Sequence, residues 1–230
     1  MEKVKDYISR IDLAIDKAVR RYTKLTAVEF DVMGMASFRN RVLLNNLIKE
    51  GDRYLEIGVW LGSTFVAALY GNKYANAIAI DNFSEFGKES EIKHTPTGNS
   101  INPSAALFHA NAKKSGILNY CFIEADCFKL NPRQKEEIKD VNVYFYDGGH
   151  TDEDQCNALT YYIDNLADVF IFVVDDWNHP PAKTGTRRGI KETNLIIHQE
   201  WELKTPEEKN QDAETWWNGL YIAVCEKPKV

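Results

Sequence analysis

Residues 54–64, YLEIGVWLGST, combine a short apolar run, an acid and a turn between two glycines. The run 54–57 has aromatic and aliphatic residues around one acid and predicts a short buried strand. Gly58 and Gly62 bracket the turn, where glycine permits conformations closed to other residues and lets the backbone approach a ligand. The stretch therefore predicts a strand, a tight turn and a helix built around a small ligand.

Two features of this stretch indicate the charge of the ligand. Ser63 opens the helix, whose first free N–H groups favour an anionic group. Glu56 would attract an amine, so a ligand with an ammonium and a carboxylate, such as the end of an amino acid, suits both. A dinucleotide is disfavoured because the third glycine of G-x-G-x-x-G is absent. The alternative is a tight strand-to-helix turn without a ligand.

Length and composition predict a globular protein of one domain with an appendage. The chain has 230 residues, of which 44% are hydrophobic and 27% charged. The formal charge of −6 speaks against sequence-independent binding of nucleic acid, which depends on lysine and arginine. We therefore expect no nucleic-acid partner and a small-molecule or protein substrate.

The cysteines and the apolar runs indicate the compartment. The four cysteines form no C-x-x-C pair and are expected to be reduced residues of the core. No apolar run approaches the length of a membrane span, and the N-terminus is charged where a signal peptide would be apolar. These features predict a cytoplasmic protein that does not associate with membranes.

The first 50 residues differ from the rest of the chain. Residues 2–22 place apolar side chains at helical spacing, and Ser37 is expected to cap a second helix over 38–48. We expect residues 1–50 to form an N-terminal helical cap on a domain formed by 51–230. The first helix would pack on the side of that domain or serve as a lid or a dimer contact, and a homodimer is compatible with it.

From residue 54 onwards, apolar runs of about six residues alternate with helical spans. This pattern predicts a doubly wound α/β fold with a mostly parallel sheet. With a terminal hairpin the sheet would have seven strands. After the first strand, the runs are 76–83, 121–128, 141–150, 169–178, 200–204 and 218–225.

Acids follow the central strands at the point where each strand ends: Asp81, Asp126, Asp147 and the pair Asp175-Asp176. In open parallel sheets, ligands bind beyond the carboxyl ends of the strands, where the strand order reverses. These acids therefore outline one site. The alternative for each acid is a helix cap or a turn.

The connections between the strands are less informative. A long polar stretch spans 84–104, and helices are expected over 104–114 and 152–166. We expect 178–186, which contains two prolines and a glycine, to be irregular and to lie over the site. A helix is expected from 187 to about 199.

Residues 37–225 resemble the class I methyltransferases that use S-adenosylmethionine. YLEIGVWLGST is similar to the first motif of that family, AIDNF (79–83) to the end of its second strand, and EADCF (124–128) to the end of its third. The resemblance implies a seven-stranded sheet with an antiparallel last strand. It assigns Glu56, Gly58 and Gly62 to the methionine moiety, Asp81 to the two ribose hydroxyls, and Asp126 and Cys127 to the adenine. Ser63 and Asn82 are also expected to bind the cofactor.

A narrower resemblance is to the macrocin O-methyltransferase group, whose strand-four Asp-Gly-x-His and strand-five Asp-Asp motifs carry a divalent metal. Asp147 begins the first motif here, and Asp175 and Asp176 form the second. Three carboxylates suit a hard cation such as Mg²⁺, which would lower the pKa of a substrate hydroxyl. A hydrogen-bonded cluster without metal is the alternative.

One position departs from that group, part of which has a second acid proposed as the base where this chain has Gly149. The departure leaves His150 as the candidate base, because an imidazole titrates near neutral pH. The alternative for His150 is a helix cap.

These observations predict an S-adenosylmethionine-dependent methyltransferase that carries out metal-assisted O-methylation of a small hydroxylated molecule, such as a sugar or a secondary metabolite. A cofactor- or nucleotide-binding module of the same fold without catalysis is the alternative. An NAD-dependent oxidoreductase is disfavoured by the missing third glycine and by Glu56.

Overall fold

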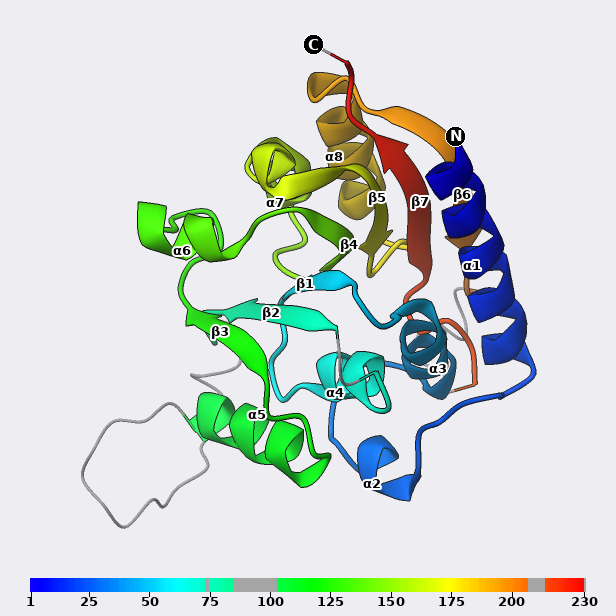
Figure 1. Ribbon diagram of the computed structural model, residues 1–230, viewed down its shortest axis with the longest axis vertical. Helices are drawn as coiled ribbons and strands as arrows, with labels where there is room; N and C mark the ends of the chain where they lie inside the picture. The colour runs from blue at the N-terminus through cyan, green and yellow to red at the C-terminus, as the bar shows by residue number, and fades with distance from the viewer. Residues whose placement is uncertain (73–74, 85–102, 207–213, 230) are drawn as a thin grey trace.

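The computed structural model describes residues 1–72, 75–84, 103–206 and 214–229, in which helices and strands alternate (Figure 1). The predicted loop 84–104 lies almost entirely outside these residues. The strands are β1 (Arg53–Ile57), β2 (Asn76–Asp81), β3 (Tyr120–Glu124), β4 (Val141–Tyr146), β5 (Leu166–Val174), β6 (Ile196–Leu203) and β7 (Leu220–Glu226). The helices are α1 (Glu2–Val19), α2 (Ala27–Phe30), α3 (Phe38–Leu47), α4 (Ser63–Leu69), α5 (Pro103–Lys114), α6 (Pro132–Glu137), α7 (Asp152–Thr160) and α8 (Pro180–Glu192), with a 3-10 turn η1 (Ile163–Asn165).

The seven strands form one sheet in the order β3-β2-β1-β4-β5-β7-β6. All neighbouring pairs are parallel except those of β7, which is antiparallel to both β5 and β6. The strand order reverses between β1 and β4, where Ile57 is in register with Tyr146. The structure thus confirms the predicted doubly wound, mostly parallel seven-stranded sheet, and the reversal point is where ligands of such sheets bind.

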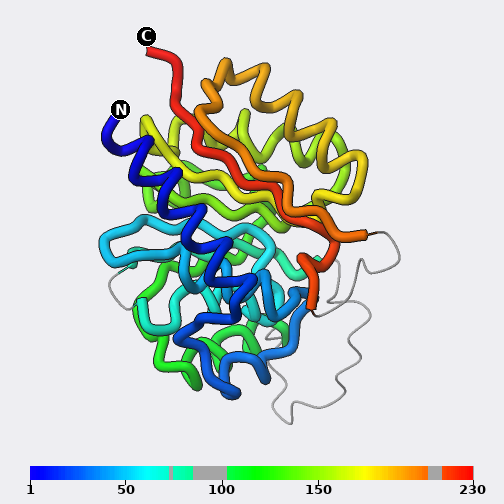
Figure 2. Tube along the Cα trace, turned by 90° about the vertical axis from the view of Figure 1, so that its right-hand side faces the viewer, coloured from blue at the N-terminus to red at the C-terminus, as the bar shows by residue number. Residues whose placement is uncertain are grey.

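Alternate side chains of each strand enter the two hydrophobic layers that cover the sheet. Tyr54 and Phe145 face the layer of α1, α3, α4 and α5, whereas Leu55 and Tyr144 face the layer of α7. Figure 2 shows α1 crossing the sheet on the first of these faces. Because both faces are covered, the central strands are apolar almost throughout.

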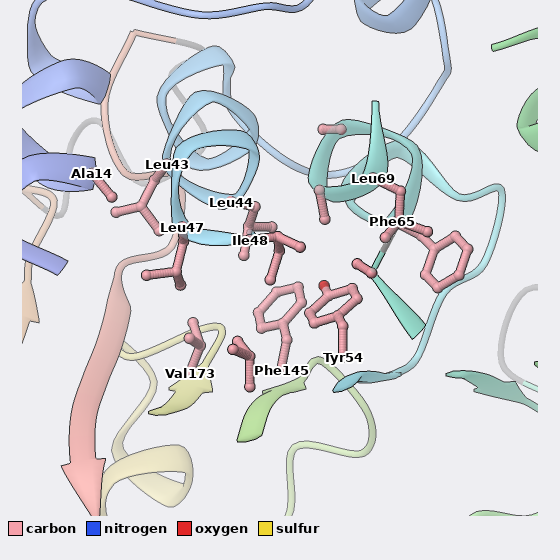
Figure 3. Close-up of a cluster of buried hydrophobic side chains, with 14 of the residues drawn as sticks. Ala14, Leu43, Leu44, Leu47, Ile48, Tyr54, Phe65, Leu69, Phe145 and Val173 are labelled. Atoms are coloured by element: carbon pink, nitrogen blue, oxygen red, sulfur yellow. The ribbon is translucent and has the colours of Figure 1, made fainter. Parts of the chain in front are cut away.

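The core beside the candidate site lies between α3, α4 and the central strands (Figure 3). Leu44, Leu47 and Phe65 pack over Tyr54 and Phe145, and all five side chains are at most 1% exposed. Burying one such large apolar side chain contributes about 1.5–3 kcal/mol. This packing holds β1 and the turn that follows it in a rigid place.

Two polar features fix the N-terminal helices. The Ser37 hydroxyl accepts the N–H of Asn40 at 3.0 Å, as predicted for a cap of α3. Arg10 of α1 forms a buried ion pair with Asp52, which precedes β1, and the Arg10 Nη1 to Asp52 Oδ1 distance is 3.1 Å. The first helix therefore packs against the sheet as part of the core. Within the described residues, no helix is long and apolar enough to cross a membrane.

The prediction for the region after β5 is wrong. Instead of an irregular segment over 178–186, α8 begins at Pro180, with His179 as its N-cap. Proline is favoured in the first turn of a helix because the missing N–H would have no partner there. The helix expected over 187–199 is therefore the second half of α8, and β6 begins at Ile196.

Candidate functional site

A cavity of about 500 Å³ opens at the carboxyl ends of β1, β2, β3, β4 and β5. Its volume is that of a small-molecule site. Of the residues predicted from the sequence, only Glu56 and Gly62 do not line it. Those that line it are Gly58, Ser63, Asp81, Asn82, Asp126, Cys127, Asp147, His150, Asp175 and Asp176.

The glycine turn after β1 forms the floor of the cavity. Gly58 and Gly62 have φ of +87° and +86°, conformations that favour glycine. A Cβ on Gly58 would lie 1.8 Å from the carbonyl oxygen of Asp147, and a Cβ on Gly62 would lie 2.9 Å from Phe108 Cδ2. The turn can therefore lie directly against the loop after β4 only because position 58 has no side chain.

Glu56 is fully buried beneath this turn. Its carboxylate accepts hydrogen bonds from the hydroxyls of Thr64, at 2.5 Å, and Tyr54. Burial raises the pKa of Glu56 to about 7, although both hydrogen bonds act to lower it. Its carboxylate thus contributes to the electrostatics of the site from below, and a direct contact with a ligand stays a prediction.

Asp81 is held in place by two backbone groups. Its Oδ2 accepts the N–H of Trp60 at 2.7 Å, and its Oδ1 accepts the N–H of Phe83 at 2.6 Å. Each carboxylate oxygen can accept a further hydrogen bond. Asp81 is therefore held at the edge of the cavity, and its binding of two ribose hydroxyls, which the resemblance implies, stays a prediction.

Asp126 and Cys127 lie where β3 ends. Asp126 Oδ1 accepts the N–H of Phe128 at 3.0 Å, and its Oδ2 accepts from Lys129 Nζ at 2.6 Å. The Cys127 carbonyl accepts from the Tyr162 hydroxyl at 2.5 Å. Burial and the charge of Asp126 raise the pKa of the Cys127 thiol to about 12, so this cysteine is a neutral part of the wall.

The loops after β4 and β5 bring an acidic group together. His150 Nε2 lies 2.5 Å from Asp176 Oδ2, and Asn218 Nδ2 donates to Asp176 Oδ1 at 2.6 Å. Asp147, His150 and Asp176 each offer one ligand atom to a set that lies within 4.8 Å. Asp175 is outside that set, and its buried Oδ1 accepts no hydrogen bond from the described residues.

The pKa values of these acids differ with their surroundings. Burial, together with the neighbouring carboxylates, raises the pKa of Asp147 and of Asp175 well above the usual range. Burial acts in the same direction on Asp176, but hydrogen bonds from His150 and Asn218 bring its pKa below the usual value. Asp176 is thus stabilised as a carboxylate, whereas Asp147 and Asp175 favour a proton or a cation.

The structure adds residues that the sequence did not indicate. Trp60, Phe83 and Trp217 line the cavity and have positive φ, between +39° and +53°, as does the predicted Asp176 at +55°. Such conformations cost about 1–3 kcal/mol each and cluster at functional sites. No local signal marks them, because residues other than glycine rarely adopt this conformation. Met35, Ala36, Asp154 and Asn218 also line the cavity.

Neither a family model nor a curated protein matches the sequence. Among solved structures, SMU.776 in complex with SAH has a TM-score of 0.57 at 12% identity, over 84% of this chain and 50% of that one. This chain thus spans half the length of that protein. TYW2 of M. jannaschii in complex with AdoMet has a TM-score of 0.56 at 12% identity, over 90% of this chain and 80% of that one. The M1A22 tRNA methyltransferase TrmK of B. subtilis has a TM-score of 0.51 at 14% identity, over 83% of this chain and 66% of that one.

These similarities contradict the expectation that the protein has no nucleic-acid partner. The expectation was drawn from the net charge of −6, but the same fold occurs in a protein described as a tRNA methyltransferase. Net charge describes the whole chain, whereas recognition depends on the local surface, so the exclusion is wrong. The chain shares the class I fold of S-adenosylmethionine-dependent methyltransferases.

Proposed function

We propose that this chain is an S-adenosylmethionine-dependent methyltransferase. The observation that carries the proposal is the cavity of about 500 Å³, which gathers the glycine turn after β1, Asp81 after β2 and the Asp126–Cys127 pair after β3. Structures of similar fold in complex with AdoMet and SAH support the same ligand here.

Each part of the cavity suits one part of this cofactor. Asp81 would accept from the two ribose hydroxyls, and the adenine would lie beside Asp126 and Cys127. The amino-acid end would lie at the turn of Gly58 and Ser63, above the buried carboxylate of Glu56. Asn82 would form part of the wall, and Gly62 would let the turn take its shape without lining the cavity.

When bound, the cofactor supplies a methyl group that its sulfonium sulfur already activates. The residues of the chain then have to align the acceptor and remove its proton. We assign the removal of this proton to His150. The 2.5 Å contact between His150 Nε2 and Asp176 Oδ2 holds the imidazole ring in place.

The proposal includes a divalent cation held by Asp147, Asp175 and Asp176. The buried Oδ1 of Asp175, which has no hydrogen-bond donor among the described residues, fits this role. Oxygen ligands favour Mg²⁺, whereas an imidazole such as His150 in the set would favour a transition metal. The cation would lower the pKa of the acceptor hydroxyl. Further support for a metal comes only from the sequence motifs that resemble those of the macrocin O-methyltransferase group.

The acceptor we propose is a small hydroxylated molecule, such as a sugar or a secondary metabolite. Among the described residues that line the cavity, six are aspartates and none is lysine or arginine. This charge favours a neutral or cationic group next to the reacting hydroxyl. A tRNA, the substrate class named for one similar structure, is the alternative that the assay includes.

The first experiment is calorimetric titration with S-adenosylmethionine and with S-adenosylhomocysteine, each with and without Mg²⁺. We expect micromolar binding, and Asp81→Asn should weaken it at least about tenfold, because a hydrogen bond to a charged group contributes about 1.5–3 kcal/mol. Asp140→Asn removes the same charge outside the cavity and should bind as the wild type does. No binding by the wild type would refute the proposed function.

The second experiment measures methyl transfer to a library of hydroxylated acceptors and to tRNA. Asp175→Ala should abolish turnover while changing the affinity for S-adenosylmethionine only a few-fold. A large loss of affinity with activity that does not need metal would contradict the metal assignment. Cofactor binding without transfer to any acceptor would instead support the non-catalytic binding module.

A further inference from the structure

Asp154 of α7 reaches back over the loop after β4. A Cβ built on Gly149 would lie 2.5 Å from Asp154 Oδ2 and 2.8 Å from its Cγ. The carboxylate therefore fills the space that any side chain at position 149 would need. Asp154 lines the cavity at this point.

One oxygen of this carboxylate is fixed and the other is available to a ligand. The Thr151 hydroxyl donates to Asp154 Oδ2 at 2.6 Å, and the N–H of Asp154 donates to the same hydroxyl at 3.1 Å. Within residues 1–72, 75–84, 103–206 and 214–229, no donor contacts Oδ1. The cap of α7 thus orients a carboxylate oxygen that can accept a hydrogen bond.

Asp154 belongs to the side of the cavity where β3 ends. The negative charge of Asp154 raises the pKa of the Cys127 thiol, as the third cause after burial and the charge of Asp126. Asp126 itself already accepts from Phe128 at 3.0 Å and from Lys129 at 2.6 Å. Of the two aspartates beside Cys127, Asp154 is therefore the one with an unengaged oxygen.

We propose that Asp154 recognises the exocyclic amine of the adenine and so determines the specificity of the site for an adenosyl cofactor. This inference rests on the proposed function. The amine would donate to Asp154 Oδ1, whereas hypoxanthine carries a carbonyl oxygen at that place, which a carboxylate repels. A site built to accept a hydrogen bond discriminates strongly against a ligand that lacks the donor.

The test compares the affinity for S-adenosylhomocysteine with that for S-inosylhomocysteine by calorimetry. The wild type should prefer the adenine compound at least about tenfold, which is 1.4 kcal/mol. Asp154→Ala should bring the two affinities within about threefold. Asp154→Asn should do the same while binding both compounds, because an amide can accept from the amine or donate to the carbonyl.

A control variant separates recognition from general charge and folding. Glu153→Gln removes a neighbouring charge that does not line the cavity. It should keep the wild-type preference, and thermal unfolding should show that every variant is folded. A wild-type preference retained by folded Asp154→Ala would overturn the inference, as would equal binding of the two compounds by the wild type. Absence of binding to either compound by the wild type would instead refute the proposed function.

Discussion

Replacing Gly58 with alanine would place a methyl group where the loops after β1 and β4 meet. Its Cβ would lie 1.8 Å from the carbonyl oxygen of Asp147 and 2.5 Å from the carbonyl carbon. Both are backbone atoms, so no change of rotamer relieves the overlap and one of the loops must move. Position 58 also has φ of +87°, which an alanine adopts only at a cost.

These two effects give the expected loss of stability. A left-handed backbone costs an L-residue about 1–2 kcal/mol. Forcing a methyl group into a filled space typically costs about 1–3 kcal/mol more. Gly58→Ala should therefore lower the free energy of unfolding by about 2–5 kcal/mol. Urea unfolding followed by circular dichroism measures it from the midpoint, provided that the m-value is unchanged.

Gly51→Ala is the matched control. Gly51 has φ of +83°, but a Cβ there would meet nothing within 4 Å, so only the backbone cost of about 1–2 kcal/mol remains. S-adenosylmethionine should stabilise this variant as it does the wild type and stabilise Gly58→Ala much less. If Gly58→Ala lost no more stability than Gly51→Ala, the contact with Asp147 would not be the reason for glycine at position 58.

Two further predictions concern buried charges. Glu56 has its pKa raised from 4.5 to about 7 in the folded state, so its contribution to stability is present below about pH 4.5 and is lost as the pH rises through 7. At 1.36 kcal/mol per pH unit this amounts to about 3 kcal/mol, and Glu56→Gln should flatten the pH dependence of the urea midpoint in that window; an unchanged slope would contradict the assignment. Arg10→Met should lose about 3–5 kcal/mol because it leaves Asp52 buried without its partner. Arg10→Met/Asp52→Asn should recover part of the loss in the same assay, and a loss below about 1 kcal/mol for the single variant would argue against a buried charge.

The sheet and the edge that carries the site could be predicted from the sequence, because both follow from local patterns. Apolar runs separated by helical spans specify parallel strands, and parallel strands end on one edge. Asp81, Asp126 and Asp147 therefore had to lie near one another, whatever the details of packing. The cap by Ser37 followed from equally local chemistry.

The start of α8 could not be predicted because its local signals are ambiguous. Pro180, Pro181 and Gly185 are typical of an irregular segment, yet prolines also fit the first turn of a helix. A Cβ on Gly185 would lie 2.2 Å from the carbonyl oxygen of Asp152, so this glycine permits close packing of α8 against α7. The glycine that suggested a loop is a requirement of tertiary packing, which a local pattern does not contain.

The pair Asp175-Asp176 shows the same limit within the site itself. Successive residues of a strand point to opposite sides, so the period of two would place only one of these carboxylates in the cavity. Both line it because Asp176 has φ of +55°, which turns its side chain towards His150. That turn is held by the N–H of Trp177, which donates to the carbonyl of Gly219 at 3.0 Å. The direction of the acid at position 176 thus depends on a contact with Gly219, just before β7 and more than 40 residues later in the chain. For this reason the sequence could predict that an acidic pair follows β5 but not that Asp176 contacts His150.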